Sequence, residues 1–285
     1  MNKTLWIADL DGTLLRSDAT LGPDSMRMLN TLIDRGVAIS IATARTPATV
    51  FAILRGLRLQ APMVMMSGAL VYDPADQEYK RTEEIELAAA GRLYEIMRDF
   101  KLDGFVYTMR DGSLSVFYET LEPPQLYQFY EERVRLYNKP FTPITSFSDI
   151  PQGPLLISIR DREERLRPAF EVMREFDEIQ ISLYEDVYLK GYWYLELSSR
   201  EASKCKGVDY IRRQYGYSRI IGFGDNLIDL SLFEGCDAGY AVRNAREELK
   251  RAAAGVIGSN DEDGVARWIW EHAEMEGSNC RRGPY

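Results

Sequence analysis

Short apolar runs alternate with amphipathic segments along the first 80 residues. The runs Leu5–Ala8, Val37–Ala42 and Met63–Met66 are rich in aliphatic side chains and predict buried strands. Between them, Pro23–Arg35 and Thr46–Leu57 show helical spacing, each with a proline at the first turn, a position that proline favours. Strand, helix, strand, helix, strand predicts parallel pairing and an α/β sheet.

The same alternation returns towards the C-terminus. The pattern predicts three strands, Trp193–Leu197, Ile220–Phe223 and Ala238–Val242, and four helices, Lys204–Tyr215, Ile228–Phe233, around Glu247–Ala254, and Val265–His272. The tail from Met275 to Tyr285 is polar and contains glycine and proline, so we expect it to fray.

The middle of the chain has a different texture. Long helical patterns at Leu87–Phe100 and Glu163–Phe176 stand beside a hairpin signal, Phe105–Met109 and Ser113–Tyr118 joined by an Arg-Asp-Gly turn. Residues 81–189 hold 13 basic and 21 acidic side chains, so this segment carries −8 of the net charge of −9. We therefore predict an α/β fold with two domains. A Rossmann-like, doubly wound parallel-sheet core comprises residues 1–80 and 190–285, and residues 81–189 form an inserted α+β domain.

Composition excludes several classes of function. The net charge of −9 argues against a nucleic-acid partner and against an anionic membrane surface. The cysteines Cys205, Cys236 and Cys280 are odd in number and far apart, which predicts neither a disulfide framework nor a zinc cluster. The single histidine, His272, excludes any metal site that needs two histidines.

The chain opens with a short apolar run that Asp9 interrupts at once. No stretch has the length of a signal peptide's apolar region or of a membrane span. We therefore expect a cytoplasmic protein with reduced thiols and no membrane partner.

Two carboxylates follow the first predicted strand directly, in Asp-Leu-Asp-Gly-Thr at Asp9–Thr13. Ligands of parallel α/β sheets bind at the carboxyl ends of the strands. Two carboxylates this close repel one another unless a cation or a proton lies between them, which favours Mg²⁺, an ion that takes oxygen ligands. A solvated turn is the plain alternative. A calcium-binding EF-hand is excluded, because Leu14 and Thr20 occupy the positions of its glycine and glutamate.

Three further segments lie where the other strands end. Thr43, after the second strand, combines a hydroxyl with backbone N–H groups at a helix N-terminus, which is typical of an anion site or of an ordinary cap. Asp225 and Asp229 follow the strand Ile220–Phe223, where Asp225 or Asn226 could instead cap the next helix. Lys204 follows the strand Trp193–Leu197; alone, such a lysine is usually solvated.

Together these segments resemble the haloacid dehalogenase superfamily of phosphotransferases, and within it the Cof-like hydrolases with a large inserted α/β cap. The DLDGT segment, the threonine of ATAR, the lysine and the GDNxxD segment occur in the family's order. The run YAVRNAREELKRAA and the later SNDEDGVARWI are also similar to the family.

The resemblance implies roles for the acidic residues. Asp9 would be the nucleophile that forms an aspartyl-phosphate, and Asp11 the general acid and then the general base. Mg²⁺ would be held by Asp9, the backbone carbonyl of Asp11 and Asp225, with Asp229 in support. No histidine is needed.

The resemblance also implies a phosphate-binding set. Thr43, Ala44, Arg45, Lys204 and Asn226 would contact the phosphoryl group or the substrate. Lys206 competes with Lys204, but the spacing to Gly207 favours Lys204.

Two positions depart from the family pattern. Ile228 stands where the family commonly has asparagine, and Ser67 stands where it tends to have the asparagine of Asn-Gly-Ala. Neither change affects the nucleophile or the metal ligands, so we expect both to alter contacts with the substrate.

The predicted function is Mg²⁺-dependent hydrolysis of small phosphorylated metabolites, with sugar phosphates as the expected class. One alternative is a phosphomutase or phosphotransferase on the same scaffold. Another is a catalytically silent sugar-phosphate-binding protein. A dinucleotide-dependent oxidoreductase is disfavoured, because Leu227 occupies the place of the third glycine after Gly222 and Gly224.

Overall fold

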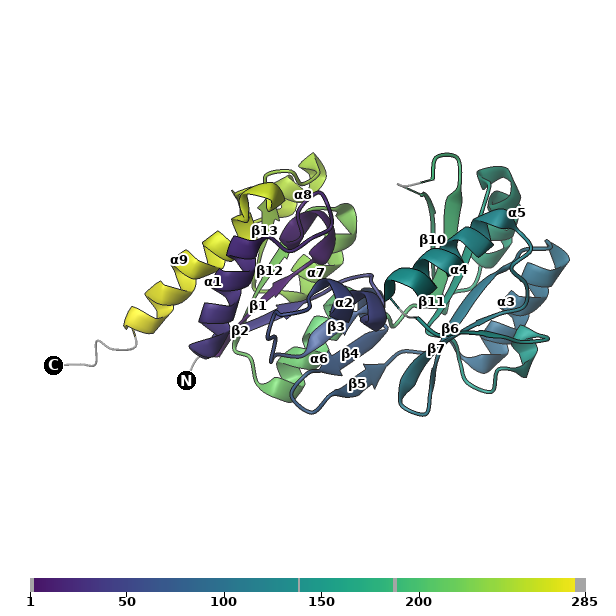
Figure 1. Cartoon of the computed structure of the whole chain (residues 1–285), viewed down its shortest axis with the longest axis horizontal. Helices are drawn as coiled ribbons and strands as arrows, with labels where there is room; N and C mark the ends of the chain where they lie inside the picture. Colours follow the sequence, from purple (N-terminus) through teal and green to yellow (C-terminus); the bar gives the residue numbers. More distant parts are fainter. Residues whose placement is uncertain (1–2, 138, 187–188, 280–285) are drawn as a thin grey trace. The chain divides into compact units, whose positions relative to one another are not determined.

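The structure is a computed structural model that describes residues 3–137, 139–186 and 189–279. The chain divides into two compact units, and each is described by itself. The core unit comprises Met1–Lys80 and Ser203–Tyr285, and the inserted domain comprises Arg81–Ala202 (Figure 1). Within the described part of the chain, no helix is long and apolar enough to cross a membrane.

The core is built on a sheet of five parallel strands in the order β14-β13-β12-β1-β2. The strands are β1 (Thr4–Ala8), β2 (Ala38–Ile41), β12 (Arg219–Gly224), β13 (Ala238–Val242) and β14 (Gly255–Ile257). The central strand β1 pairs with β12 on one side and β2 on the other, so the carboxyl ends of these three strands lie together. Their first residues past the strands therefore meet at one edge of the sheet.

Helices cover both faces of this sheet, as the doubly wound prediction requires. On one face, Leu5 and Ile220 pack with Val208 of α6 (Lys204–Tyr215) and Leu232 of α7 (Leu230–Gly235). On the other face, Trp6, Phe223 and Tyr240 surround Trp268 of α9 (Gly264–Asn279), which packs against α1 (Pro23–Asp34). Helix α2 (Pro47–Ile53) follows β2, and α8 (Glu247–Ala252) follows β13.

The third predicted strand continues the core. Strand β3 (Met63–Met65) forms a parallel bridge from Val64 to Ala42, and it also begins a three-stranded sheet with β4 (Leu70–Asp73) and β5 (Glu78–Thr82). Helix α9 extends to Asn279, into the first part of the tail for which fraying is expected. The remaining residues, Cys280 included, lie outside the described part of the chain.

The inserted domain has a six-stranded sheet in the order β10-β11-β9-β6-β7-β8. Its strands are β6 (Gly104–Arg110), β7 (Ser113–Tyr118), β8 (Phe141–Pro143), β9 (Leu156–Asp161), β10 (Ile179–Glu185) and β11 (Trp193–Ser199). The expected hairpin is confirmed: β6 and β7 pair antiparallel, with Val106 opposite Phe117. One face of the sheet packs its apolar residues on α3 (Leu87–Asp99) and α5 (Glu163–Met173).

The C-terminal boundary predicted at residue 190 is wrong. Strand β11 was expected to belong to the core, but it pairs antiparallel with β10 and β9, so the inserted domain ends at Ala202. Along β11, Leu195 and Leu197 are buried and alternate with Tyr194 and Glu196, a period-2 pattern that fits an antiparallel sheet. The division after Lys80 coincides with the expected one.

The opposite face of the inserted sheet is partly covered by α4 (Pro124–Tyr137), and it buries a lysine. Lys139 is 5% exposed, and its ammonium lies 4.4 Å from the centre of the Tyr107 ring and 5.7 Å from that of Phe141. Burial lowers the pKa of Lys139 to about 7; the charge of Arg133 lowers it further, and Glu196 opposes the shift.

Because this pKa is depressed, Lys139→Met should stabilise the inserted domain more at pH 6.5 than at pH 9. Below pH 7 both the folded and the unfolded chain hold the proton, so the wild type bears the full cost of burying an ammonium. Between about pH 7 and pH 10.4 the unfolded wild-type chain holds more protons than the folded one, so the free energy of unfolding of the wild type rises with pH. The variant has no lysine at this position and lacks this rise. Calorimetric melting temperatures of both proteins at the two pH values measure the effect. An equal difference at both pH values would contradict it.

Candidate active site

The first acidic segment forms a tight turn directly after β1. The N–H of Leu14 donates to the carbonyl of Asp9 at 3.2 Å, and that of Leu15 donates to the carbonyl of Leu10 at 2.9 Å. Gly12 has a φ of +74°, and a Cβ at this position would lie 2.5 Å from Oδ2 of Asp225. Only glycine combines this backbone conformation with so close an approach of a carboxylate. The Asp-Gly-Thr sequence therefore brings the turn against the loop that follows β12.

That second loop is organised by Asp229. Its Oδ2 accepts the N–H groups of Asp225 and Asn226, both at 3.0 Å, and its side chain is fully buried. The side chain of Asn226 accepts the N–H of Leu227 at 2.7 Å, so Asn226 caps the turn Leu227–Asp229, the plainer of its two possible roles.

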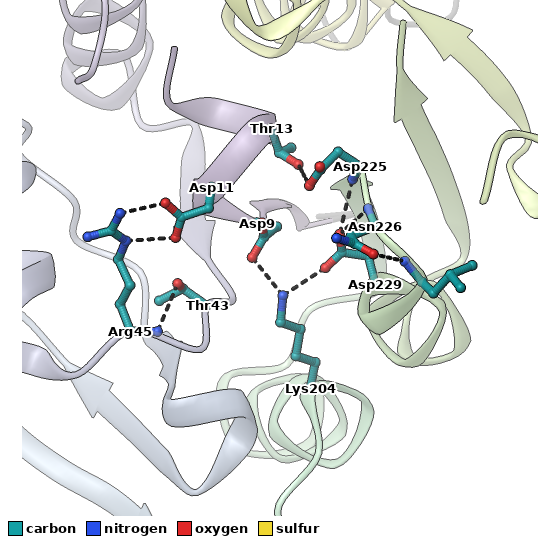
Figure 2. Close-up of polar contacts among 10 residues, drawn as sticks. Asp9, Asp11, Thr13, Thr43, Arg45, Lys204, Asp225, Asn226 and Asp229 are labelled. Atoms are coloured by element: carbon teal, nitrogen blue, oxygen red, sulfur yellow. Dashed lines mark hydrogen bonds and ion pairs between the residues drawn. The ribbon is translucent and has the colours of Figure 1, made fainter. Parts of the chain in front are cut away.

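Lys204, the first residue of α6, links the two loops. Its Nζ lies 2.6 Å from Oδ1 of Asp9 and 2.7 Å from Oδ1 of Asp229, and the lysine is only 2% exposed (Figure 2). The N-cap Ser203 accepts the backbone N–H of Lys206 at 3.1 Å, which starts the helix at this point. Lys204 rather than Lys206 thus contacts the acidic cluster.

The cluster carries an excess of negative charge. Carboxylate oxygens of Asp9, Asp225 and Asp229 lie within 4.8 Å of one another. With Lys204 protonated, three ionised carboxylates leave a net charge of −2, which one divalent cation would balance. Three oxygen donors are also the ligand chemistry that Mg²⁺ takes, so these residues fit this ion.

The pKa shifts have the same origin. Burial raises the pKa of Asp9 to about 7; Lys204 opposes the shift, and the charges of Asp229 and Asp225 add to it. Burial, followed by the charge of Asp229, raises the pKa of Asp225 to about 6, against the hydrogen bond from Thr13. Burial alone would lower the pKa of Lys204, but Asp9 and Asp229 outweigh it and raise that pKa. Without a further cation, the site thus favours protonated carboxyl groups.

Asp11 lies on the other side of Asp9, away from this cluster (Figure 2). Its carboxylate accepts two hydrogen bonds from Arg45, Nε to Oδ2 at 2.7 Å and Nη2 to Oδ1 at 2.5 Å. Half of the Asp11 side chain is exposed, whereas the Arg45 side chain is 18% exposed. Arg45, which was expected to bind substrate, is therefore hydrogen-bonded to Asp11, the expected general acid and base.

Thr43 and Ala44 form a small polar group at the end of β2. Thr43 is 1% exposed, its N–H donates to Val64, and its Oγ1 accepts the N–H of Arg45 at 3.1 Å. Within residues 3–137, 139–186 and 189–279, the N–H of Ala44 has no hydrogen-bond partner. This N–H and the Thr43 hydroxyl are thus suited to bind an anion.

Two contributors were missed by the sequence reasoning. Thr13 donates its hydroxyl to Oδ1 of Asp225 at 3.0 Å, and Asn244 donates its amide to the carbonyl of Gly12 at 2.7 Å. Thr13 stands in the first motif, and Asn244 in the C-terminal run that resembles the family. The signal for both residues is therefore a polar side chain within a segment that resembles the family.

Removing the buried ammonium of Lys204 should destabilise the core. Lys204→Gln leaves Asp9 and Asp229 buried without a counter-charge, which typically costs about 3–5 kcal/mol of the free energy of unfolding. Lys206→Gln, two residues along the same helix, is the matched control and should cost much less. Urea unfolding in metal-free buffer, followed by tryptophan fluorescence, measures both. Equal losses would mean that the contacts of Lys204 are not specially stabilising.

Comparisons with known proteins identify the family. A family model of haloacid dehalogenase-like hydrolases matches residues 6–269. The 5-amino-6-(5-phospho-D-ribitylamino)uracil phosphatase of Bacillus subtilis is 25% identical over 274 residues, covering 94% of this chain and 96% of the relative. The pyridoxal phosphate phosphatase of Escherichia coli is 23% identical over 268 residues, covering 93% and 96%.

Solved structures show the same fold. The crystal structure of a haloacid dehalogenase-like hydrolase from Bacteroides thetaiotaomicron superposes with a TM-score of 0.78 at 22% identity, covering 94% of this chain and 99% of the other. With the family model spanning nearly the whole chain, the predicted superfamily is confirmed: the protein belongs to the haloacid dehalogenase-like hydrolases.

Proposed function

We propose that the protein is a Mg²⁺-dependent phosphatase that hydrolyses small phosphomonoesters through an aspartyl-phosphate on Asp9. The observation that carries the proposal is the cluster in which Lys204 joins Asp9 to Asp229 while a carboxylate oxygen of Asp225 lies within 4.8 Å of an oxygen of each. A nucleophilic carboxylate, a buried cation and a set of oxygen donors are the groups that phosphoryl transfer requires.

The metal would be held by Asp9 and Asp225, with the backbone carbonyl of Asp11 as a further oxygen ligand and Asp229 in support. When bound, Mg²⁺ would neutralise the excess charge of the carboxylates and of the phosphoryl group. The fit rests on the net charge of the cluster and on the raised pKa values of Asp9 and Asp225.

In the first step, a carboxylate oxygen of Asp9 attacks phosphorus and the bond to the ester oxygen breaks. The leaving alkoxide takes a proton from Asp11. In the second step, Asp11 takes a proton from a water molecule, whose oxygen attacks phosphorus and releases inorganic phosphate and the Asp9 carboxylate. Lys204, Thr43 and the N–H of Ala44 would bind the phosphoryl oxygens, where negative charge develops.

Asp11 can act as an acid only after leaving Arg45. Both carboxylate oxygens of Asp11 accept hydrogen bonds from Arg45, so neither oxygen is placed to pass a proton to a leaving group. We propose that Asp11 turns away from Arg45 during the reaction cycle, which frees the guanidinium for the substrate. The half-exposed Asp11 side chain leaves room for that rotation.

The proposed substrates are phosphomonoesters of small polar metabolites, with sugar phosphates as the expected class. The names of the two curated relatives specify a phosphorylated ribityl compound and pyridoxal phosphate, two different carriers of one phosphate group. This variety supports a common phosphate site with a variable leaving group.

The nucleophile assignment predicts that Asp9→Asn abolishes Mg²⁺-dependent hydrolysis of p-nitrophenyl phosphate. The amide keeps the shape of the side chain but is a poor nucleophile. Asp34→Asn is the control. Asp34 belongs to the core unit, but its side chain is exposed at the surface, where it pairs with Arg58. Acid-quenched wild type should carry a phosphoryl group at Asp9 by mass spectrometry. Full activity of Asp9→Asn would refute the assignment.

The acid role predicts that Asp11→Asn discriminates between leaving groups. In single-turnover experiments, release of alcohol from an alkyl phosphate should slow by about 10²–10⁴-fold. Release of p-nitrophenolate should slow much less, because this anion leaves without a proton. Equal slowing for both substrates would count against Asp11 as the general acid.

A further inference from the structure

The loop between β13 and α8, residues 243–246, contacts both acidic turns of the site. The side-chain amide of Asn244 donates to the carbonyl of Gly12 at 2.7 Å, and the backbone N–H of Arg246 donates to the carbonyl of Asp225 at 2.9 Å. One short loop therefore holds the turn after β1 and the loop after β12 in a common position.

Asn244 is itself held in one orientation. Its Oδ1 accepts the N–H of Asn260 at 3.0 Å, which leaves its Nδ2 directed at Gly12. Asn260 is 4% exposed, and its own amide donates to the carbonyl of Leu15 at 3.0 Å. The contacts of the two asparagines thus secure the turn Leu10–Leu14 near its middle and just past its end.

The contact at Gly12 matters because glycine does not restrict its own backbone. Gly12 has a φ of +74° and lies against the carboxylate of Asp225. The next residue, Thr13, donates its hydroxyl to the same carboxylate at 3.0 Å. Rotation of the peptide between Gly12 and Thr13 would move this hydroxyl. A hydrogen bond to the Gly12 carbonyl therefore restricts the backbone of Gly12 and Thr13, the two residues that contact the Asp225 carboxylate.

We infer that Asn244 is a positioning residue that fixes the Gly12–Thr13 peptide and, through Thr13, the carboxylate of Asp225, and so sets the affinity of the site for its divalent cation. The inference rests on the proposed function in one respect, namely that Asp225 is a metal ligand. Asn244 itself touches neither metal nor phosphate in this scheme.

The test compares Asn244→Ala with Asn30→Ala in the full chain. Asn30 makes the same pair of contacts elsewhere in the core: its amide donates to the carbonyl of Gly56 at 2.9 Å, and its Oδ1 accepts the N–H of Arg58 at 2.9 Å. Both variants lose an asparagine that joins two backbone segments, but only Asn244 adjoins the acidic turns.

The Mg²⁺ dissociation constant of the substrate-free protein is measured by calorimetry, and the rise in melting temperature on adding Mg²⁺ is measured alongside. Loss of a residue that orients a metal ligand typically weakens binding by about 10–100-fold. We expect a weakening in this range for Asn244→Ala, a smaller thermal shift, and activity largely restored at high Mg²⁺. Asn30→Ala should bind Mg²⁺ like the wild type even if it melts earlier.

Asn244→Asp separates positioning from charge. An added carboxylate near the cluster would by itself strengthen cation binding, whereas loss of the donor to Gly12 would weaken it. We expect weaker binding. Wild-type affinity in Asn244→Ala, or tighter binding in Asn244→Asp, would overturn the inference. A wild type that binds no Mg²⁺ would overturn the proposed metal site and this inference with it, and the wild-type titration alone reveals that case.

Discussion

The buried ion pairs of Lys204 are the contacts on which the site depends. The lysine reaches Asp9, which lies 195 positions earlier in the chain, and Asp229, which lies 25 positions later. Each carboxylate ends up among other carboxylates in a poorly solvated place, where unpaired charge is costly. The ammonium allows the turn after β1 and the loop after β12 to approach one another, and the remaining negative charge creates the demand for a divalent ion.

Much of this arrangement is predictable because its requirements are local. Asp9 and Asp225 each follow a buried strand, and parallel strands bring their carboxyl ends to one edge of a sheet. The side-chain partners are less predictable. The pairing of Asp11 with Arg45 depends on rotamers and not on spacing, and the contact of Asn244 with Gly12 spans 232 positions. Strand β11 was assigned to the wrong sheet because apolar alternation indicates a strand without naming its neighbours.

The two departures from the family pattern have distinct physical consequences. Ser67 has a φ of +55°, in the left-handed region that asparagine tolerates better than serine. Serine in place of asparagine therefore keeps a strained turn and has a shorter side chain. Ile228 is 49% exposed and Leu227 is 41% exposed, so the turn that carries Asp229 presents apolar surface. A substrate that meets this turn would find hydrocarbon where the resemblance to the family implies an amide. We expect such differences to alter what is recognised while leaving the phosphoryl chemistry unchanged.

The close approach of glycines to carboxylates also limits how the sequence can evolve. A Cβ at Gly12 would collide with the Asp225 carboxylate, and one at Gly224 would lie 2.5 Å from Cβ of Asp229. A side chain at either position would force the adjacent aspartate to move, so we expect both glycines to resist substitution. We expect changes in substrate recognition to arise instead where side chains are exposed and free to change, as on the turn that carries Ile228.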